Sequence, residues 1–270
     1  MKTITQDIVR CPSCRSGFLY TDAIAPQHVR CKTCQSAFSY NNQIINLLPS
    51  TEQSRSLAQY FMESPIITHI YESRLWRRNP VFEYLTGISF NEEFKKIVHA
   101  GKIDHANKIL DLACGSGIYL RPIAQKNPNA IVVGLDMSPS MLTYASQQIE
   151  IEKLTNTILI RGNALDLPFS EQMFNSVNCC GALHLFPDVD RVLQEVYRIL
   201  VPGGRFTTGV FLKHIGIIGS LMAQSQKYFV GVDSFTAESL TAALSRQGFA
   251  EIACHHAKGV WLIMHAQKPL

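Results

Sequence analysis

Short apolar runs alternate with amphipathic stretches along the second half of the chain. The runs of strand length are 108–113, 130–135, 157–161, 176–180, 205–210, 251–255 and 260–266. Between several of them, apolar residues recur at the spacing of a helix, as in 139–149 and 189–200. Strands that alternate with helices are typical of a parallel sheet with helices on both faces. We therefore predict an α/β fold with a doubly wound, mostly parallel sheet.

Local signals indicate where these helices begin and end. Ser138 and Asp188 stand directly before two of them, where a short polar side chain caps the first backbone N–H groups. The Pro-Gly-Gly sequence at 202–204 is predicted to end the second helix, and Gly248 to end a later helix over 237–246.

The rest of the chain divides into zones of different composition. Residues 1–50 contain paired cysteines, and 51–104 are mixed in charge with a helical pattern. An unusually apolar insert covers about 211–232. We predict a small domain at 1–50, a helical linker or lid at 51–104, and a catalytic domain at 105–270 that contains the insert.

The N-terminal cysteines form two Cys-x-x-Cys pairs. Cys11 and Cys14 make the first pair, and Cys31 and Cys34 follow after sixteen intervening residues. This spacing predicts a zinc ribbon, in which four thiolates bind a structural Zn²⁺ in a closed tetrahedral site. A segment of about 50 residues needs such a staple because its core is small. A pair of redox dithiols is the alternative.

The other cysteines and the absence of long apolar runs indicate the compartment. Cys114, Cys179, Cys180 and Cys254 lie in apolar surroundings and are predicted to be buried free thiols, as in a reducing compartment. No apolar run approaches the roughly 18 residues of a membrane span, and the first ten residues lack the apolar core of a signal peptide. We expect a cytoplasmic protein without a membrane span.

A strand that runs into a glycine-rich turn is the strongest chemical signal. Residues 109–117 read Ile-Leu-Asp-Leu-Ala-Cys-Gly-Ser-Gly. Gly115 and Gly117 allow the backbone to approach a ligand, and the following helix N-terminus offers N–H groups to a carboxylate. Asp111 can accept from an ammonium group. A carboxylate and an ammonium on one carbon are the methionine end of S-adenosylmethionine, which we predict as the cofactor.

A dinucleotide is the rival ligand for a Gly-x-Gly turn. Such sites usually have a third glycine three residues later, where this chain has Leu120. An acid at the strand end would also repel a pyrophosphate. Asp136, at the end of the next strand, is placed to hold ribose hydroxyls, and Met137 beside it to pack on adenine.

From about 107 to 211 the chain resembles the class I S-adenosylmethionine methyltransferases of the ubiquinone/menaquinone-biosynthesis type (methyltransferase domain family 11). The resemblance implies a Rossmann-like, seven-stranded sheet whose last strand runs antiparallel. It also implies which residues bind the cofactor: Asp111, Gly115 and Gly117 the methionine part, Asp136 the ribose, and Met137, Asn163 and Ala164 the adenine. We add Ala113 and Cys180 to this set. Many relatives have Asp in place of Asn163, and Gly is frequent in place of Ala113.

The combination of ribbon and methyltransferase narrows the resemblance. The layout is similar to plant-chloroplast and bacterial methyltransferases with a cysteine-rich N-terminal segment, whose linker resembles residues 64–77. It is less similar to the rRNA guanine-N1 methyltransferases, which include a histidine in the second half of their zinc module.

His184, just after the fourth strand, is the best-placed general base, and Tyr71 is the next candidate, followed by His69 and His214. A histidine satisfied by a loop carbonyl is the alternative for His184. The insert and the segment before 107 carry many apolar and aromatic residues, which either line an acceptor pocket or belong to the hydrophobic core.

We therefore predict a methyltransferase that acts on a small apolar or aromatic metabolite. The alternative is an rRNA or tRNA base methyltransferase that grips RNA with its ribbon, since residues 1–50 hold five Lys/Arg against two acids. A second alternative is a cofactor-binding regulatory or assembly protein without turnover.

Overall fold

The computed structural model describes residues 8–21, 27–48, 79–213 and 234–270. The linker residues before Asn79, with Tyr71 and His69, lie outside the described residues. So does most of the apolar insert, with His214. The parts of the linker and insert predictions that fall there stay predictions.

The predicted strands lie side by side in one sheet. They are β5 (Lys108–Leu112), β6 (Ile131–Asp136), β7 (Thr157–Arg161), β8 (Phe174–Cys180), β9 (Leu200–Phe211), β10 (Ala250–Lys258) and β11 (Trp261–Gln267). The first five run parallel, and β11 lies antiparallel between β9 and β10. The doubly wound sheet with an antiparallel last strand is therefore confirmed.

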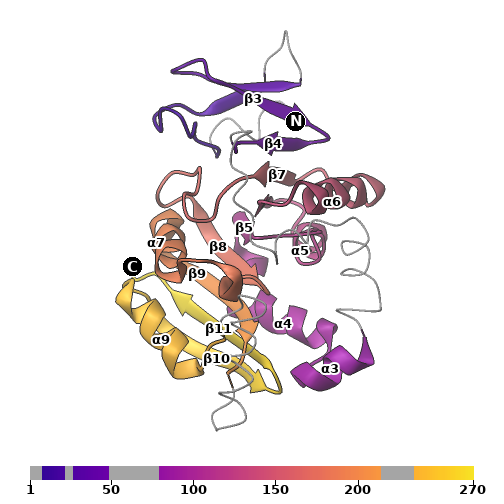
Figure 1. Cartoon of the computed structure of the whole chain (residues 1–270), viewed down its shortest axis with the longest axis vertical. Coiled ribbons are helices and arrows are strands. Elements are labelled where there is room, and N and C mark those ends of the chain that lie inside the picture. Colours follow the sequence, from indigo (N-terminus) through magenta and orange to yellow (C-terminus); the bar gives the residue numbers. More distant parts are fainter. Residues whose placement is uncertain (1–7, 22–26, 49–78, 214–233) are drawn as a thin grey trace.

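Helices cover both faces of this sheet (Figure 1). They are α3 (Pro80–Thr86), α4 (Phe90–Ala100), α5 (Leu120–Lys126), α6 (Pro139–Ile151), α7 (Val189–Ile199) and α9 (Ala237–Arg246), with short 3-10 turns η1 (Ile103–His105) and η2 (Leu183–Leu185). The predicted caps are confirmed: Ser138 accepts the Met141 amide at 3.3 Å, and Asp188 accepts the Arg191 amide at 2.9 Å.

The boundary between α7 and β9 differs from the prediction. The helix ends at Ile199, and the strand begins at Leu200, which pairs with Phe174 on β8. The Pro-Gly-Gly sequence at 202–204 therefore lies inside the strand, where the pairing with β8 shifts register between Phe174 and Ser176. The prediction that this sequence ends the helix was wrong, because strand pairing begins before it.

The N-terminal segment adds four strands to the same sheet. They are β1 (Leu19–Thr21), β2 (His28–Cys31), β3 (Ala37–Asn41) and β4 (Ile44–Asn46). The last of them runs parallel to β7, with Ile45 opposite Ile160. The order across the sheet is β1-β2-β3-β4-β7-β6-β5-β8-β9-β11-β10, and Figure 1 shows the indigo strands stacked beyond β7.

The hydrophobic core crosses the same boundary. Val9 and Leu19 of the cysteine-rich segment belong to one buried cluster with Ile160 and Phe169 of the α/β part. The segment that we predict as a domain of its own thus continues the sheet and the core of the rest of the chain.

One cysteine prediction is wrong. Cys254 is exposed, whereas Cys114, Cys179 and Cys180 are buried as expected. The reason is that β10 is the outermost strand of the sheet, and most of its residues face solvent. Within the described ranges, no helix combines the length and the apolar character needed to cross a membrane.

Candidate functional site

The glycine-rich turn follows β5 at the carboxyl edge of the sheet, between β6 and β8. The strand order reverses here, which is where open α/β sheets bind ligands. Gly115 has a φ of +54°, and, its two chain neighbours apart, no atom of the described residues lies within 4 Å of the position that a Cβ would take there. The turn therefore leaves open space above Gly115 for a ligand.

Two neighbouring residues of the turn, Ala113 and Gly117, also have a left-handed backbone. Ala113, predicted as the last residue of the strand, lies beyond it with a φ of +55°. A Cβ on Gly117 would lie 3.5 Å from Ala145 of α6. Gly117 thus faces a helix, and its φ of +84° is the reason for glycine there.

Asp111 is a buried carboxylate with one unsatisfied oxygen. Its exposed fraction is 2%, and its Oδ1 accepts from Asn178 Nδ2 at 2.7 Å. Its Oδ2 is buried and has no hydrogen-bond partner within the described chain. Burial raises the pKa of Asp111 to about 7; the Asn178 hydrogen bond and the backbone amide of Leu120 oppose this rise, and the charge of Asp136 adds slightly to it. An ammonium group at Oδ2 would satisfy this oxygen.

Two more polar groups surround Asp111. The hydroxyl of Ser116 is buried and has no partner among the described residues. Cys180, at the end of β8, donates its thiol to Asn178 Oδ1 at 3.1 Å. Sequence reasoning missed Asn178, because a polar residue inside an apolar strand gives no sign of which neighbouring strand it faces.

Asp136 joins the end of β6 to the glycine-rich turn. Its Oδ2 accepts the Gly115 amide and its Oδ1 accepts the Ser138 amide, both at 2.8 Å. Burial raises the pKa of Asp136, and these amides lower it. Each carboxylate oxygen keeps a second lone pair, so the side chain can still accept from ribose hydroxyls.

The three candidate adenine-binding residues lie at the adjacent ends of β6 and β7. Met137 is 39% exposed, while Ala164 is buried. The Gly162 amide donates to the Asp136 carbonyl at 3.0 Å and so holds the two strand ends together. Asn163 Oδ1 accepts the Leu165 amide at 2.9 Å and keeps one lone pair for a ligand.

A row of aromatic rings lies farther along the same edge. The buried ring of His184, on η2, is 4.6 Å from the Phe211 ring at the end of β9, and Phe211 is 5.6 Å from Trp261. Glu93 of α4 is also buried, and its Oε1 accepts from Trp261 Nε1 at 2.9 Å and from Tyr119 Oη at 2.7 Å.

Glu93 was not predicted, although the sequence holds a signal for it. It shares the apolar face of α4 with Phe90 and Ile97, at helical spacing. A carboxylate on such a face is rarely buried unless it is paired.

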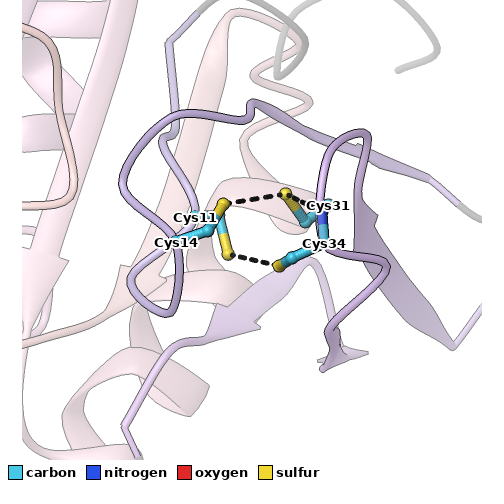
Figure 2. A group of neighbouring side chains, drawn as sticks. All are labelled: Cys11, Cys14, Cys31 and Cys34. Atoms are coloured by element: carbon cyan, nitrogen blue, oxygen red, sulfur yellow. Dashed lines mark hydrogen bonds between the residues drawn. The ribbon is translucent and has the colours of Figure 1, made fainter.

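The four N-terminal cysteines converge from two loops (Figure 2). Their Sγ atoms all lie within 4.8 Å of one another. The distances from Cys11 to Cys34 and from Cys14 to Cys31 are 3.6 Å, too long for a disulfide bond of about 2.05 Å. Four sulfurs around a tetrahedral Zn²⁺ with bonds of about 2.3 Å lie about 3.8 Å apart.

The surroundings of this cluster favour the thiolate at Cys14 and Cys34, whereas burial raises the pKa of Cys11 to about 11. The amide of Thr33 donates to Cys31 Sγ at 3.3 Å. Hydrogen bonds, above all from the Ser16 hydroxyl, lower the pKa of Cys14 to about 5. The donor set and its spacing are therefore compatible with a tetrahedral metal ion.

Known proteins resemble the α/β part of the chain. Residues 109–204 match a family model described as a methyltransferase domain. A demethylmenaquinone methyltransferase of Geobacillus sp. is 32% identical over 143 residues, which cover 52% of this chain and 60% of that protein. A demethylmenaquinone methyltransferase of Symbiobacterium thermophilum is 37% identical over 43% of this chain and 46% of its own length. The chain thus spans less than two thirds of the curated relatives that it matches.

A solved structure shares the fold at low identity. Phosphoethanolamine N-methyltransferase 2 of Haemonchus contortus, in complex with S-adenosyl-L-methionine, has a TM-score of 0.63 and 16% identity, over 80% of this chain and 61% of its own. At this identity the likeness shows the fold alone, which is the Rossmann-like fold that the sequence predicts.

Proposed function

We propose that the protein transfers a methyl group from S-adenosylmethionine to a small apolar or aromatic acceptor, since residues 109–204 match a methyltransferase domain model and the chain shares the fold of a methyltransferase. The observation that carries this proposal is the pairing of Asp111 with Gly115. A buried carboxylate oxygen of Asp111, without a hydrogen-bond partner among the described residues, belongs to the strand that leads into a turn with open space at Gly115. Both features fit the amino acid end of the cofactor.

The residues of the turn bind and orient the cofactor. Asp111 accepts from its ammonium group, and Asp136 accepts from the ribose hydroxyls while it holds the Gly115 amide in place. Met137 and the segment 163–164 flank the adenine. These contacts fix the direction of the sulfonium, and alignment of this kind can supply most of the catalysis in a displacement reaction.

The bound cofactor supplies an electrophilic methyl group, whose bond to sulfur breaks with both electrons left on sulfur as the acceptor atom forms its new bond. The aromatic row of His184, Phe211 and Trp261 borders the acceptor, and its apolar side chains exclude water. His184, against Phe211, takes the proton that the acceptor loses. The relatives' name, demethylmenaquinone methyltransferase, supports an acceptor with an aromatic ring.

We also propose that Cys11, Cys14, Cys31 and Cys34 bind one structural Zn²⁺. Four thiolates leave no coordination position for a substrate, so the metal would stabilise the fold and take no part in methyl transfer.

The cofactor assignment is tested by calorimetry with S-adenosylmethionine and NAD. Asp136→Ala should weaken S-adenosylmethionine binding by about 1–3 kcal/mol, because buried polar partners lose their hydrogen bonds. Asp104→Ala is a matched control, since Asp104 is exposed and precedes β5 at the opposite edge of the sheet. NAD that binds more tightly than S-adenosylmethionine would contradict the proposal.

The acceptor is tested by incubating labelled cofactor separately with demethylmenaquinone in reduced form and with ribosomal and transfer RNA. We expect label only in the small aromatic compound. Label in RNA would replace the proposed acceptor with a nucleic acid, and cofactor binding without transfer to any acceptor would favour a role without turnover.

A further inference from the structure

We infer that the cysteine-rich segment positions the adenine end of the cofactor site, so that metal binding and cofactor binding strengthen each other; the inference rests on the proposed function. The feature concerned is the adenine loop, defined as residues 162–170 after β7, which carries Asn163 and Ala164. Nothing in a methyltransferase domain requires a metal module there.

The backbone around the first cysteine pair is bound to the adenine loop. The Arg10 amide donates to the Pro168 carbonyl at 2.8 Å, and Val9 forms an antiparallel bridge with Phe169. Both Val9 and Phe169 are fully buried. Val9 and Arg10, the two residues directly before Cys11, therefore pack on the adenine loop.

Two arginines at the borders of the first cysteine pair hold the loop by side chains. Arg10 Nε donates to Ser170 Oγ at 2.7 Å, and both terminal nitrogens of Arg15 donate to the carboxylate of Asp166. The two arginines are themselves linked, since Arg10 Nη1 donates to the Arg15 carbonyl at 3.0 Å. A bidentate arginine–carboxylate pair also fixes orientation.

The cysteine-rich segment is also linked to Met137, through Arg161. Arg161, the last residue of β7, lies opposite Asn46 of β4 and accepts the Leu47 amide at 2.9 Å on its carbonyl. Its Nε donates to the Met137 carbonyl at 3.0 Å. The cysteine-rich segment thus contacts the adenine loop directly and is linked to Met137 through Arg161.

The metal controls these contacts because it fixes the turn that carries them. Although the segment shares the main core, the turns that carry its two cysteine pairs meet at the cluster, and metal binding is coupled to the folding of the turns that hold its ligands. Loss of the ion would release the turn between Cys11 and Cys14, and with it Arg10 and Arg15. Coupling between two binding equilibria is reciprocal, so the cofactor should in turn retain the metal.

The first test follows zinc in the full-length, zinc-loaded protein. Release of zinc to a chromogenic chelator is measured with and without saturating S-adenosylhomocysteine. We expect slower release with the ligand, and an affinity for S-adenosylhomocysteine that falls about 5- to 150-fold when zinc is removed and returns when it is restored. The same comparison with Cys254→Ser controls for the exposed thiol outside the cluster.

The second test keeps the metal and breaks one contact. Arg15→Gln should retain zinc and lose about two- to fivefold in affinity for S-adenosylhomocysteine, the range for an exposed ion pair. Arg246→Gln is the matched control: the Arg246 and Asp190 side chains are 58% and 53% exposed, against 54% and 44% for Arg15 and Asp166. The control should bind as the unaltered protein does.

The outcomes separate the two proposals. Zinc release that ignores the ligand, or Arg15→Gln with unaltered affinity, would overturn the inference and leave the proposed function standing. Failure of the unaltered protein to bind S-adenosylhomocysteine would overturn both.

Discussion

Asp111 makes cofactor binding depend on pH. Its carboxyl has a pKa of about 7 in the folded protein, above the ordinary 3.8. Between these values the folded state holds a proton that the unfolded state has lost. The contribution of Asp111 to the free energy of unfolding is therefore greatest below about pH 4 and is lost as the pH rises through about 7. A bound ammonium group favours the ionised carboxylate of Asp111 and offsets the cost of burying its charge.

We therefore expect the affinity for S-adenosylhomocysteine to rise about tenfold between pH 6 and pH 8, in step with the ionised fraction of Asp111. Calorimetry in buffers of different ionisation enthalpy should also detect a proton released on binding. Asp111→Asn should bind weakly and without this dependence. A pH profile that the substitution leaves unchanged would assign the ammonium group to another partner.

Gly17 tests the cysteine cluster with a single methyl group. A Cβ at this position would overlap Cys31 Sγ and lie 2.7 Å from Thr33 Oγ1. Gly17→Ala must therefore displace a proposed ligand, and we expect it to lower zinc affinity about 10- to 100-fold, as other changes beside metal ligands do. Ser13→Ala, an exposed site between two of the cysteines, should retain the metal in the same competition with a chelator.

His184 is the remaining residue with a proposed chemical role. If it takes a proton from the acceptor, His184→Ala should reduce kcat by about 10²- to 10⁴-fold and leave cofactor affinity unchanged. His105→Ala, at an exposed histidine that precedes β5 at the amino edge of the sheet, provides the comparison. Equal kcat in the two variants would reduce His184 to a packing role against Phe211.

At the level of single residues, the sequence predicts what depends on local spacing. The four cysteines and the acid-to-glycine turn are recognisable because their members lie close together along the chain. Asn178 and Glu93 are not, because each becomes significant only through a partner 67 or 168 positions away, Asp111 or Trp261 respectively.

Among the elements, α4 is tied to the sheet by one buried carboxylate. Glu93→Leu would leave the Trp261 and Tyr119 donors without their acceptor, and we expect a loss of about 1–3 kcal/mol in the free energy of unfolding. Glu93→Gln, whose amide oxygen can still accept, should lose less. Urea titration of both variants checks this order, and equal losses would mean that charge, rather than hydrogen bonding, holds α4.

Element boundaries show where periodicity stops being informative. Caps such as Ser138 and Asp188 were located correctly, because capping depends on residues three positions apart. The start of β9 was missed, because Leu200 continues the helical pattern of α7 while its backbone already pairs with Phe174. Where a helical pattern and a strand pattern overlap, pairing with the neighbouring strand sets the boundary, and the sequence does not show which strand is the neighbour.

At the scale of the whole molecule, the main difference from the sequence prediction is the continuity of the sheet. Composition separates residues 1–50 from the rest, and a zinc ribbon is an independent unit in most settings. The sequence around Ile45 and Val9 does not indicate that their side chains pack against residues outside the segment. Their burial with Ile160 and Phe169 is a long-range packing event.

The position of β4 has a consequence for handling and engineering the protein. Strand β4 occupies one hydrogen-bonding side of β7, whose other side is taken by β6. A chain shortened to begin at Asn79 would expose that side, together with the apolar Ile158 and Ile160, as an open sheet edge. Open edges recruit strands from other molecules, so the shortened chain should form oligomers or precipitate in light scattering, while the full chain does not. The cysteine-rich segment would then protect the protein from aggregation by covering the edge of β7. Removing the segment would not give a soluble catalytic fragment.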